Sequence, residues 1–556
     1  MKEYKNIMLK IIPLGGLGEI GLNMMVFEYK DSMFIIDAGL MFPEDYMVGV
    51  DLVVPDISYI RANRSKLMGI VLTHAHEDHI GALPYILKEI NVPVFGTSFT
   101  IGLVKKKLED HGLLSSALLH EISTDETLKI GEFELEFISV NHSIVGGVGI
   151  SIMTPYGRII HTGDFKISSS SLAGIKTDVN RFARCGEEGV LALLSDSTNV
   201  EREGYTKSAQ EIAKTLSAIT AELKGRVIVA LFASNISRIQ QIIDIAGHRG
   251  RKVAFIGRSI ETNVKIASEL GYLNVPENME VSVGQINSLP NNKILMLMTG
   301  SQGEPMSALT RMTEGRHAGV KIKKDDTVIL SSKFIPGNER AIANIINKLY
   351  RLGADVIYEK ISMIHISGHA FREELKLMIN LTKPEYFIPV HGEYRHLTLH
   401  ARLAEDVGIK KENVLLAENG HIIECDENGV RLGGKVSTGR VLIDGKGVGD
   451  VGKSVLKERR SLSQEGFVAV TMAFDEETGF IIYGPEISSR GFVFETETGH
   501  LLQDAECVIL EIVEEIGPDE PDRIEHIRRD IRKKLKKYFY FTIKRRPVIL
   551  PFIIEV

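Results

Sequence analysis

Residues 69–79 read GIVLTHAHEDH, an apolar, strand-like segment followed at once by His74, His76, Asp78 and His79. Four potential metal ligands at the end of a strand can turn their imidazoles and carboxylate into one pocket. The alternative is a polar surface loop, which explains the composition less well because packed histidines repel one another when protonated. The stretch therefore predicts a metal site at a strand end.

Three more candidate ligands follow strand-like segments: His142 in VNHS, Asp164 in HTGDF and His391 in PVHGE. Each alone is typical of a structural residue, but together they complete two ligand sets, with Asp164 able to bridge them. His74, His76 and His142 form an all-nitrogen set that suits Zn²⁺. Asp78, His79 and His391 form a second set that mixes nitrogen and oxygen ligands. Two metals about 3.5 to 4 Å apart would activate one hydroxide and stabilise an in-line phosphoryl displacement.

Asp37, in FIIDAG, follows another strand-like run. Its carboxylate can hold a histidine ligand in the correct orientation by accepting a hydrogen bond from the ring nitrogen that faces away from the metal. It can equally be a turn residue that caps the strand. The sequence leaves both interpretations open.

Length and composition predict a globular chain of several domains. The 556 residues are 44% hydrophobic and 25% charged, with a net charge of −7, so any nucleic-acid binding must use a local basic patch. The three cysteines are far apart, which excludes a disulfide framework and favours a reducing cytoplasm. Neither a signal-peptide core nor a run of 18 uncharged apolar residues occurs, so we expect neither secretion nor membrane insertion.

The pattern of apolar residues changes along the chain. Short strands and turns fill residues 8–60, strands alternate with helices from about residue 65, and hairpins return between residues 128 and 165. Repeated strand-helix units, beginning with RVIVALFAS and a helix from about Ile236, predict an inserted parallel α/β domain. The tail predicts strands, a long helix and a last strand in TIKRRPVILPFIIEV.

These motifs resemble known families. The stretch HAHEDH, together with Asp37, His142 and Asp164, resembles the signature of the metallo-β-lactamase hydrolases. The three additional motifs of the β-CASP nucleases are similar to SDST, SGHA and VHGE, which contain Asp196, His369 and His391. The resemblance is closest to the ribonuclease J family, from PLGGLGEIG and DAGLMFPED through HTGDFK, FASNI, GSQGEP and IPGN to SRGFV and RRPVILP. No ligand is altered, unlike in catalytically degenerate members.

The resemblance implies an α/β fold, in which a metallo-β-lactamase αββα sandwich carries an inserted parallel α/β β-CASP domain and a small C-terminal α+β domain. The sandwich would comprise residues 1–208 and 355–445, and the β-CASP domain residues 209–354. A Gly-rich linker, residues 446–460, would lead to the C-terminal domain, residues 461–556.

The resemblance also implies roles for single residues. Two Zn²⁺ ions per subunit, or Mn²⁺, would be held by His74, His76, Asp78, His79, His142, Asp164 and His391. Asp37 would orient the histidine ligands without binding the metal itself. Catalytic roles would fall to Asp78, Asp196 and His369. Substrate would contact Ser234, Asn235, Ser367, Gly368 and His369. For Ser234 the alternative is a helix N-cap, and for His365 we expect a structural role.

The implied function is that of a cytoplasmic, zinc-dependent ribonuclease. It would act as a 5′-to-3′ exonuclease on 5′-monophosphorylated RNA and as an endonuclease, in rRNA processing, RNA maturation and mRNA decay. A homodimer or homotetramer and RNA-decay protein partners are expected, and no membrane. The alternatives are a small-molecule metallohydrolase, a DNA-directed β-CASP nuclease, and a non-catalytic subunit of an RNA-decay complex.

Three further motifs compete with this interpretation. Residues 16–21 match GxGxxG, but a strand rather than a helix is predicted to follow, which argues against a dinucleotide site. Residues 447–454 match a P-loop, but a P-loop needs a sustained helix next, and the following segment meets a glycine after about a dozen residues, so we expect no nucleotide site. Residues 528–541 join a basic run to four aromatic residues. They could bind RNA, or form a solvated helix face that leads into a core strand.

Overall fold

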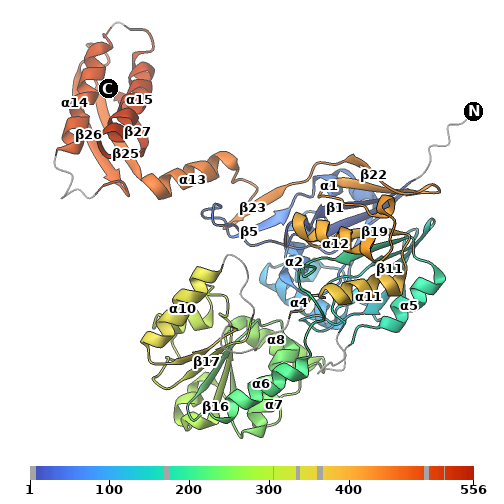
Figure 1. Cartoon of the computed structure of the whole chain (residues 1–556). Coiled ribbons are helices and arrows are strands. Elements are labelled where there is room, and N and C mark those ends of the chain that lie inside the picture. Colours follow the sequence, from blue (N-terminus) through green and yellow to red (C-terminus); the bar gives the residue numbers. More distant parts are fainter. Residues whose placement is uncertain are drawn as a thin grey trace, which may run out of the picture. The chain divides into compact units, whose positions relative to one another are not determined.

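The computed structural model describes residues 8–167, 176–304, 306–332, 338–359, 367–493, 500–518 and 520–556. The chain forms two compact units (Figure 1). The larger unit comprises Met1–Met41 and Val54–Arg440, and the smaller one Phe42–Val53 and Val441–Val556. In the described part, no helix combines the length and apolar character that membrane crossing requires.

Two mixed β-sheets in the larger unit form the predicted sandwich. The first has eight strands, in the spatial order β22 (Gly429–Lys435), β21 (His421–Asp426), β1 (Leu9–Gly15), β3 (Met24–Tyr29), β4 (Ser32–Ile36), β6 (Leu67–Val71), β7 (Val94–Gly96) and β8 (Leu119–Glu121). The second has six strands, in the order β19 (Tyr386–Val390), β13 (Ala192–Asp196), β12 (Gly157–His161), β11 (Val148–Thr154), β10 (Phe133–Ser139) and β9 (Thr127–Ile130).

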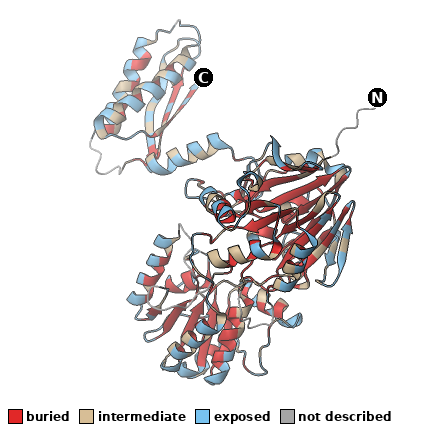
Figure 2. Cartoon of the chain, turned by 45° about the vertical axis from the view of Figure 1, so that its right-hand side comes forward, coloured by how far each residue is buried: buried red, intermediate tan, exposed pale blue. Residues whose placement is uncertain are grey.

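The main hydrophobic core lies between the two sheets. Fully buried residues from both sheets pack in one cluster, for example Phe27 and Phe34 from the first and Phe133 and Ile388 from the second. Burial of this much apolar surface is the dominant favourable term in folding. Figure 2 shows the buried strands inside and the exposed helix faces outside.

Helices cover the outer faces of the sandwich. On the six-stranded sheet they are α5 (Val179–Glu188), α11 (Arg372–Thr382) and α12 (Tyr394–Asp406). Their apolar faces pack in a second cluster with Phe182, Leu375 and Leu403. Near the eight-stranded sheet lie α1 (Ser58–Ala62), α2 (Glu77–Ile80), α3 (Leu83–Leu87) and α4 (Ser98–Asp110). This arrangement confirms the predicted αββα sandwich.

The inserted domain contains a five-stranded parallel sheet. Its order is β15 (Lys252–Ile256), β16 (Ile294–Met298), β14 (Val227–Ala230), β17 (Thr327–Leu330) and β18 (Asp355–Ile357). The helices are α6 (Ala209–Ala221), α7 (Ile236–His248), α8 (Arg258–Glu269), α9 (Ala308–Thr313) and α10 (Glu339–Arg351). Strand β18 lies at the start of the segment 355–445, which was predicted to belong to the sandwich. It belongs to the inserted sheet instead, because it pairs in parallel with β17.

The helix predicted from about Ile236 begins at that residue. Its N-cap is Asn235, whose side chain accepts a hydrogen bond from the backbone N–H of Arg238 at 3.1 Å. The capping role considered for Ser234 is thus filled by its neighbour, because an Asn side-chain oxygen reaches the first-turn N–H groups from that position. The Ser234 carbonyl instead accepts from the Ile236 N–H.

The smaller unit contains the predicted α+β domain. A three-stranded sheet of β26 (Ile481–Arg490), β25 (Phe467–Phe474) and β27 (Val548–Glu555) packs against α14 (Leu501–Glu515) and α15 (Arg523–Ile543). The basic run and the aromatic residues after it lie on the single helix α15, so the rings do not lead directly into a strand. Phe539 is buried in the core, whereas Phe541 is 64% exposed.

The P-loop match does not form a phosphate-binding loop. A helix does follow, α13 (Lys453–Glu465), contrary to the expectation that no sustained helix would. However, β24 (Gly447–Val448) pairs with β23 (Arg440–Asp444), and the Gly449 N–H donates to the Leu442 carbonyl. These hairpin bonds engage the loop backbone, whereas a P-loop must point its N–H groups at phosphate. The GxGxxG match is likewise followed by strand β3, as predicted.

His400 on α12 predicts a pH dependence of stability. Its Nδ1 lies 2.9 Å from the Ser197 hydroxyl, and burial lowers its pKa to about 3. Because the folded pKa lies below the unfolded one, the unfolded chain binds more protons, and stability falls as the pH drops below about 6.5. Between about pH 7 and pH 5 this group should cost about 2 kcal/mol of unfolding free energy.

The His400→Gln variant should lose that part of the pH dependence. The measurement is denaturant unfolding at both pH values, in which contributions from other groups cancel when the variant is compared with the wild type. His248→Gln, an exposed position on α7, is the control. An unchanged slope in His400→Gln would contradict the assignment.

Candidate metal centre

The candidate ligands meet because parallel strands bring their carboxyl ends to one edge. In the first sheet, β4 and β6 run in parallel and are followed by Asp37 and by residues 73–79. In the second sheet, β12, β13 and β19 run in parallel and lead to Asp164, Asp196 and His391. Residues from segments more than 300 positions apart thus converge.

The first predicted ligand set forms a tight group. The Nε2 atoms of His74 and His142 each lie 3.0 Å from His76 Nδ1 and 3.6 Å from Asp164 Oδ2. Ligand atoms about 2.0 to 2.1 Å from a tetrahedral Zn²⁺ lie about 3.3 Å from one another. The four side chains therefore fit a single ion.

The second predicted set lies beside the first. His391 Nε2 is 3.4 Å and His79 Nε2 is 3.6 Å from Asp78 Oδ2. Asp164 reaches into this group as well, with Oδ2 at 3.4 Å from His79 Nε2 and Oδ1 at 3.8 Å from His391 Nε2. A carboxylate shared between two sets of ligands is the arrangement expected of a two-metal site.

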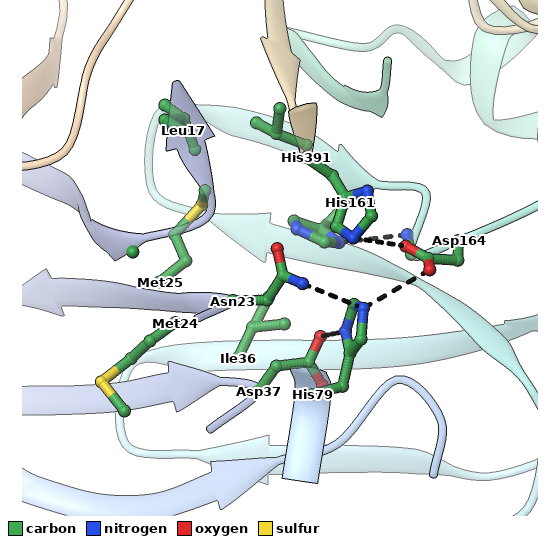
Figure 3. A pocket seen from close by; sticks show the side chains of 13 residues that line it. Leu17, Asn23, Met24, Met25, Ile36, Asp37, His79, His161, Asp164 and His391 are labelled. Atoms are coloured by element: carbon green, nitrogen blue, oxygen red, sulfur yellow. Dashed lines mark hydrogen bonds and ion pairs between the residues drawn. The ribbon is translucent and has the colours of Figure 1, made fainter. Parts of the chain in front are cut away.

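Asp37 holds His79 in place. Its Oδ2 lies 2.7 Å from His79 Nδ1, which leaves Nε2 facing the cluster. The same oxygen accepts from the Thr73 hydroxyl, and Oδ1 accepts from the Thr73 N–H, each at 2.8 Å. Asp37 adopts a φ of 61° and His391 a φ of 53°, in the left-handed region that costs about 1 kcal/mol or more for such residues. Of the two interpretations of Asp37, the structure contains the hydrogen bond that orientation of His79 requires (Figure 3).

Asp37→Asn should weaken metal binding without unfolding the protein. The amide can no longer act as a charged acceptor for both His79 and Thr73, and loss of such a partner typically lowers metal affinity about 10- to 100-fold. Metal titration followed by metal analysis of the dialysed protein would measure this. Asp178→Asn is a matched control, because an N-cap position tolerates either residue. Equal affinity in Asp37→Asn and wild type would contradict the role.

The electrostatics of the first group favour metal ligation. Burial, together with repulsion from neighbouring imidazoles, lowers the pKa of His74 and His142 well below the usual value. Burial also lowers the pKa of His76 to about 4. All three are therefore neutral near pH 7, which is the form of imidazole that binds a metal.

The second group attracts positive charge. Burial alone would lower the pKa of His79 and His391, but carboxylates led by Asp164 outweigh it and raise both values well above the usual one. In turn, His391 and His79 overcome the effect of burial on Asp164 and hold its pKa well below the usual range. A bound cation can take the place of the protons that these carboxylates otherwise stabilise.

Asp196 and His369 form a pair beside the cluster. His369 Nδ1 lies 2.8 Å from Asp196 Oδ2, while Oδ1 accepts from the N–H and hydroxyl of Thr198 at 2.9 and 2.7 Å. Gly368 packs against a ligand, since its carbonyl lies 2.8 Å from His142 Nδ1. A side chain at Gly368 would meet the His142 ring within 2.6 Å, so only glycine fits there.

Several polar residues around the cluster were not predicted from the sequence. Asn23 lies 3.1 Å from His79 Nε2 and donates to the Asp78 carbonyl at 3.0 Å. Asn199 donates to the Ser367 hydroxyl at 2.5 Å. Lys166 donates to the Ser367 carbonyl at 3.2 Å, and burial lowers the pKa of its amine to about 8. The sequence signal for Lys166 is its place in the quoted segment HTGDFK, and that for Asn199 is its place directly after the quoted segment SDST.

Not every predicted site residue joins the cluster. Ser367, Gly368 and His369 lie against it, as described. Ser234 and Asn235 follow β14 of the five-stranded sheet, and within the described residues no hydrogen bond connects them to the ligands. His365 lies outside the described residues.

A small cavity lies behind His79 and His391 (Figure 3). Its volume is about 20 Å³, which is room for about one water molecule. Its lining includes the apolar side chains of Leu17 and Met25 as well as the polar side chain of Asn23. It is therefore too small to hold a substrate.

Fold and cluster together define a hydrolase of the metallo-β-lactamase class. A model of the metallo-β-lactamase superfamily matches residues 17–215. A solved structure of a protein of unknown function from Enterococcus faecalis has a TM-score of 0.53 at 16% identity. It covers 75% of this chain and 100% of its own, and shows the shared fold alone.

More specific models match the remaining segments. They describe the β-CASP domain of ribonuclease J over residues 224–349, an RNA specificity domain of Zn-dependent metallo-hydrolases over 353–416, and the ribonuclease J C-terminal domain over 454–556. Ribonuclease J 1 of Streptococcus pyogenes is 41% identical over 554 residues, which cover 99% of each chain. Ribonuclease J 2 of Staphylococcus aureus is 40% identical and covers 100% of this chain and 99% of its own. The chain belongs to the ribonuclease J family.

Proposed function

We propose that this protein is a metal-dependent ribonuclease that hydrolyses RNA phosphodiester bonds. It acts as a 5′-to-3′ exonuclease on 5′-monophosphorylated RNA and as an endonuclease, in RNA maturation and mRNA decay. The observation that carries the proposal is Asp164, which reaches both ligand groups and also lies 3.8 Å from the ring of His369. The site thus combines metal ligands with a histidine that can act on a leaving group.

We propose two Zn²⁺ ions as the cofactor, with Mn²⁺ as the alternative. One ion would be held by His74, His76, His142 and Asp164, and the other by Asp78, His79, His391 and Asp164. Bound ions would lower the pKa of a water molecule and neutralise charge that develops on the phosphate. The support is the donor set, because imidazole and carboxylate ligands within 4.8 Å of one another suit these ions.

The Asp196–His369 pair would handle the leaving group. With Nδ1 bonded to Asp196, His369 keeps Nε2 available to donate a proton to the departing 3′ oxygen or a hydrogen bond to the phosphate. Thr198 fixes the Asp196 carboxylate from the other side. Ser367, Gly368, Ser234 and Asn235 remain our candidates for contacts to the RNA.

The domain division and cellular setting are also proposals. We retain residues 1–208 with 355–445, 209–354, 446–460 and 461–556 as the division, except that residues 355–357, which form β18, belong to the inserted domain. We propose a homodimer or homotetramer from the family resemblance. A cytoplasmic location fits the free thiols of Cys185, Cys425 and Cys507.

The decisive experiment compares one RNA with a 5′-monophosphate, a 5′-triphosphate or a 5′-hydroxyl, with and without chelator. Release of mononucleotides from the monophosphorylated RNA, lost with chelator, is the expected result. Internal fragments alone would remove the exonuclease assignment and keep the nuclease. No cleavage of RNA by metal-loaded protein would favour a small-molecule metallohydrolase or a non-catalytic subunit, and preferential cleavage of matched DNA would favour a DNA-directed enzyme.

A further inference from the structure

A basic hollow lies in the inserted domain, between the ends of α6 and α7 and the amino ends of β14, β15 and β16. Its volume is about 490 Å³. Its lining contains four cationic residues and no carboxylate: Thr220, Ala221, Leu223, Lys224, Arg249, Arg251, Asn291, Asn292 and Lys293. This composition is unusual in a chain whose net charge is −7. We call this feature the basic hollow.

Arg251 builds the floor of the basic hollow. It is 5% exposed, and its guanidinium donates to the carbonyls of Leu223 at 2.5 Å, Gly225 at 2.8 Å and Ile294 at 3.1 Å. These bonds tie the segment before β14 to the first residue of β16. The shape of the hollow is therefore fixed by buried hydrogen bonds rather than by mobile side chains.

The other three cations are exposed and have no acidic partner. Arg249 donates to the Ser217 carbonyl at 3.3 Å, and Lys293 Nζ lies against the Gly250 turn that separates Arg249 from Arg251. Within the described residues, neither they nor Lys224 form an ion pair. Elsewhere in this domain exposed cations do so, as in Lys348–Glu314 at 2.9 Å. Unpaired like charges around one hollow repel one another, and an anionic ligand relieves this repulsion.

The lining chemistry selects phosphate groups rather than bases. Cations and amide donors such as Asn291 and Asn292 bind phosphate oxygens, whereas bases are recognised by stacking on aromatic rings. The lining contains no aromatic residue. The hollow is also large enough to hold more than one phosphate group, as an RNA backbone presents them.

The basic hollow is separate from the metal centre. It opens at the amino ends of the parallel strands, whereas Ser234 and Asn235 follow the carboxyl end of β14. Strand β14 has four residues, so at about 3.3 Å per residue its two ends are about 10 Å apart. The hollow and the candidate RNA contacts thus lie at opposite ends of β14, so we expect a long RNA bound at the metal ligands to reach the hollow and a very short one not to.

We propose that the basic hollow binds the phosphate backbone of RNA as a second, non-catalytic site that adds affinity for long substrates. This inference rests on the proposed ribonuclease function for the identity of the ligand. It assigns Lys224, Arg249 and Lys293 to backbone contacts, and Arg251 to the support of the floor.

The test is the triple variant Lys224→Ala, Arg249→Ala and Lys293→Ala. The control removes the same charge elsewhere in the domain: Lys214→Ala, Lys265→Ala and Lys348→Ala. Both triples are compared with the wild-type sequence in a His76→Ala background, so that binding is measured without cleavage. Unstructured RNAs of about 30 and about four nucleotides are used at several salt concentrations. Arg251 is kept so that the floor stays intact, and thermal unfolding checks each variant.

The hollow triple should bind the long RNA about tenfold more weakly, with a salt slope smaller by about 2, because each phosphate contact on a single strand contributes about 0.7. Affinity for the short RNA should not change, and the control triple should match the wild type. Equal losses for both RNAs, equal losses in the control, or no loss would overturn the proposal. Lost binding of inorganic tripolyphosphate without any change for RNA would also overturn it.

The two proposals fail separately. Cleavage of the short RNA by the protein with intact ligands, compared with His76→Ala, reports the ribonuclease function whether or not the basic hollow is altered. The ratio of long-RNA to short-RNA affinity reports the hollow alone. A protein that cuts nothing but still loses long-RNA affinity in the hollow triple would retain the second site and lose the proposed activity.

Discussion

Replacing His76 with alanine is expected to reduce RNA cleavage by about a thousandfold or more and to lower the metal content of the purified protein. His76 Nδ1 lies 3.0 Å from a nitrogen of both His74 and His142, so its loss opens the first ligand group. The remaining two imidazoles and the shared Asp164 cannot complete a tetrahedral site with protein ligands alone. Single-turnover cleavage together with metal analysis measures both effects.

His248→Ala is the matched control, since this histidine is exposed in the last turn of α7 and far in sequence from every ligand. It should retain wild-type cleavage and metal content. A His76→Ala protein that keeps full activity would show that the first group is not part of the catalytic centre. Lost activity with unchanged metal content would instead place His76 in substrate binding.

The centre of the site could be predicted from sequence because its chemistry is local. The HAHEDH stretch puts four ligands after one strand, and a strand end is where a short turn can direct them together. His142, Asp164 and His391 carried a weaker signal, but each follows an apolar run. Their meeting then depends on strands of one sheet that point the same way. Strands β12 and β19 each run parallel to β13, and β10, which precedes His142, runs in the direction of β12 because both pair antiparallel with β11.

Residues that act through a single hydrogen bond could not be predicted. Asn23 contacts His79 and Asp78, yet it stands in a Gly-rich turn where an asparagine is ordinary. Thr198 fixes Asp196 from a turn in the same way. Neither residue type nor spacing distinguishes such contacts, because they arise from how loops of distant segments pack.

Prediction of the fold from the sequence was limited by two similar ambiguities. Strand β18 has three residues, and its pattern fits either sheet; only its pairing with β17 decides. The P-loop match failed for a different reason from the expected one. A helix follows the motif, but the loop folds back on β23, and sequence letters do not report where backbone N–H groups point.

Glu374 on α11 connects the segments that carry the catalytic candidates. It is fully buried, and its carboxylate accepts four hydrogen bonds, each at 2.8 Å, from the N–H groups of Ile167, Thr206 and Phe371 and from the Thr206 hydroxyl. Ile167 lies three residues after Asp164, and Phe371 lies two residues after His369. The adjacent Glu373 is partly exposed and pairs with Lys376. Because the two glutamates are neighbours in the sequence, only the structure shows which of them connects these segments.

Glu374→Gln should therefore destabilise the larger unit by about 2 to 4 kcal/mol, because the amide group opposes at least one backbone N–H that has no other acceptor. It should also lower kcat by about tenfold at a temperature where the variant is folded, with little change in KM, since Asp164 and His369 lose their fixed spacing. Glu373→Gln should change stability by less than about 0.5 kcal/mol and leave kcat unchanged. Denaturant unfolding and steady-state cleavage measure both variants. A loss of stability with an unchanged kcat would limit Glu374 to holding the fold together, whereas a lower kcat would establish that the spacing of the two catalytic segments depends on this carboxylate.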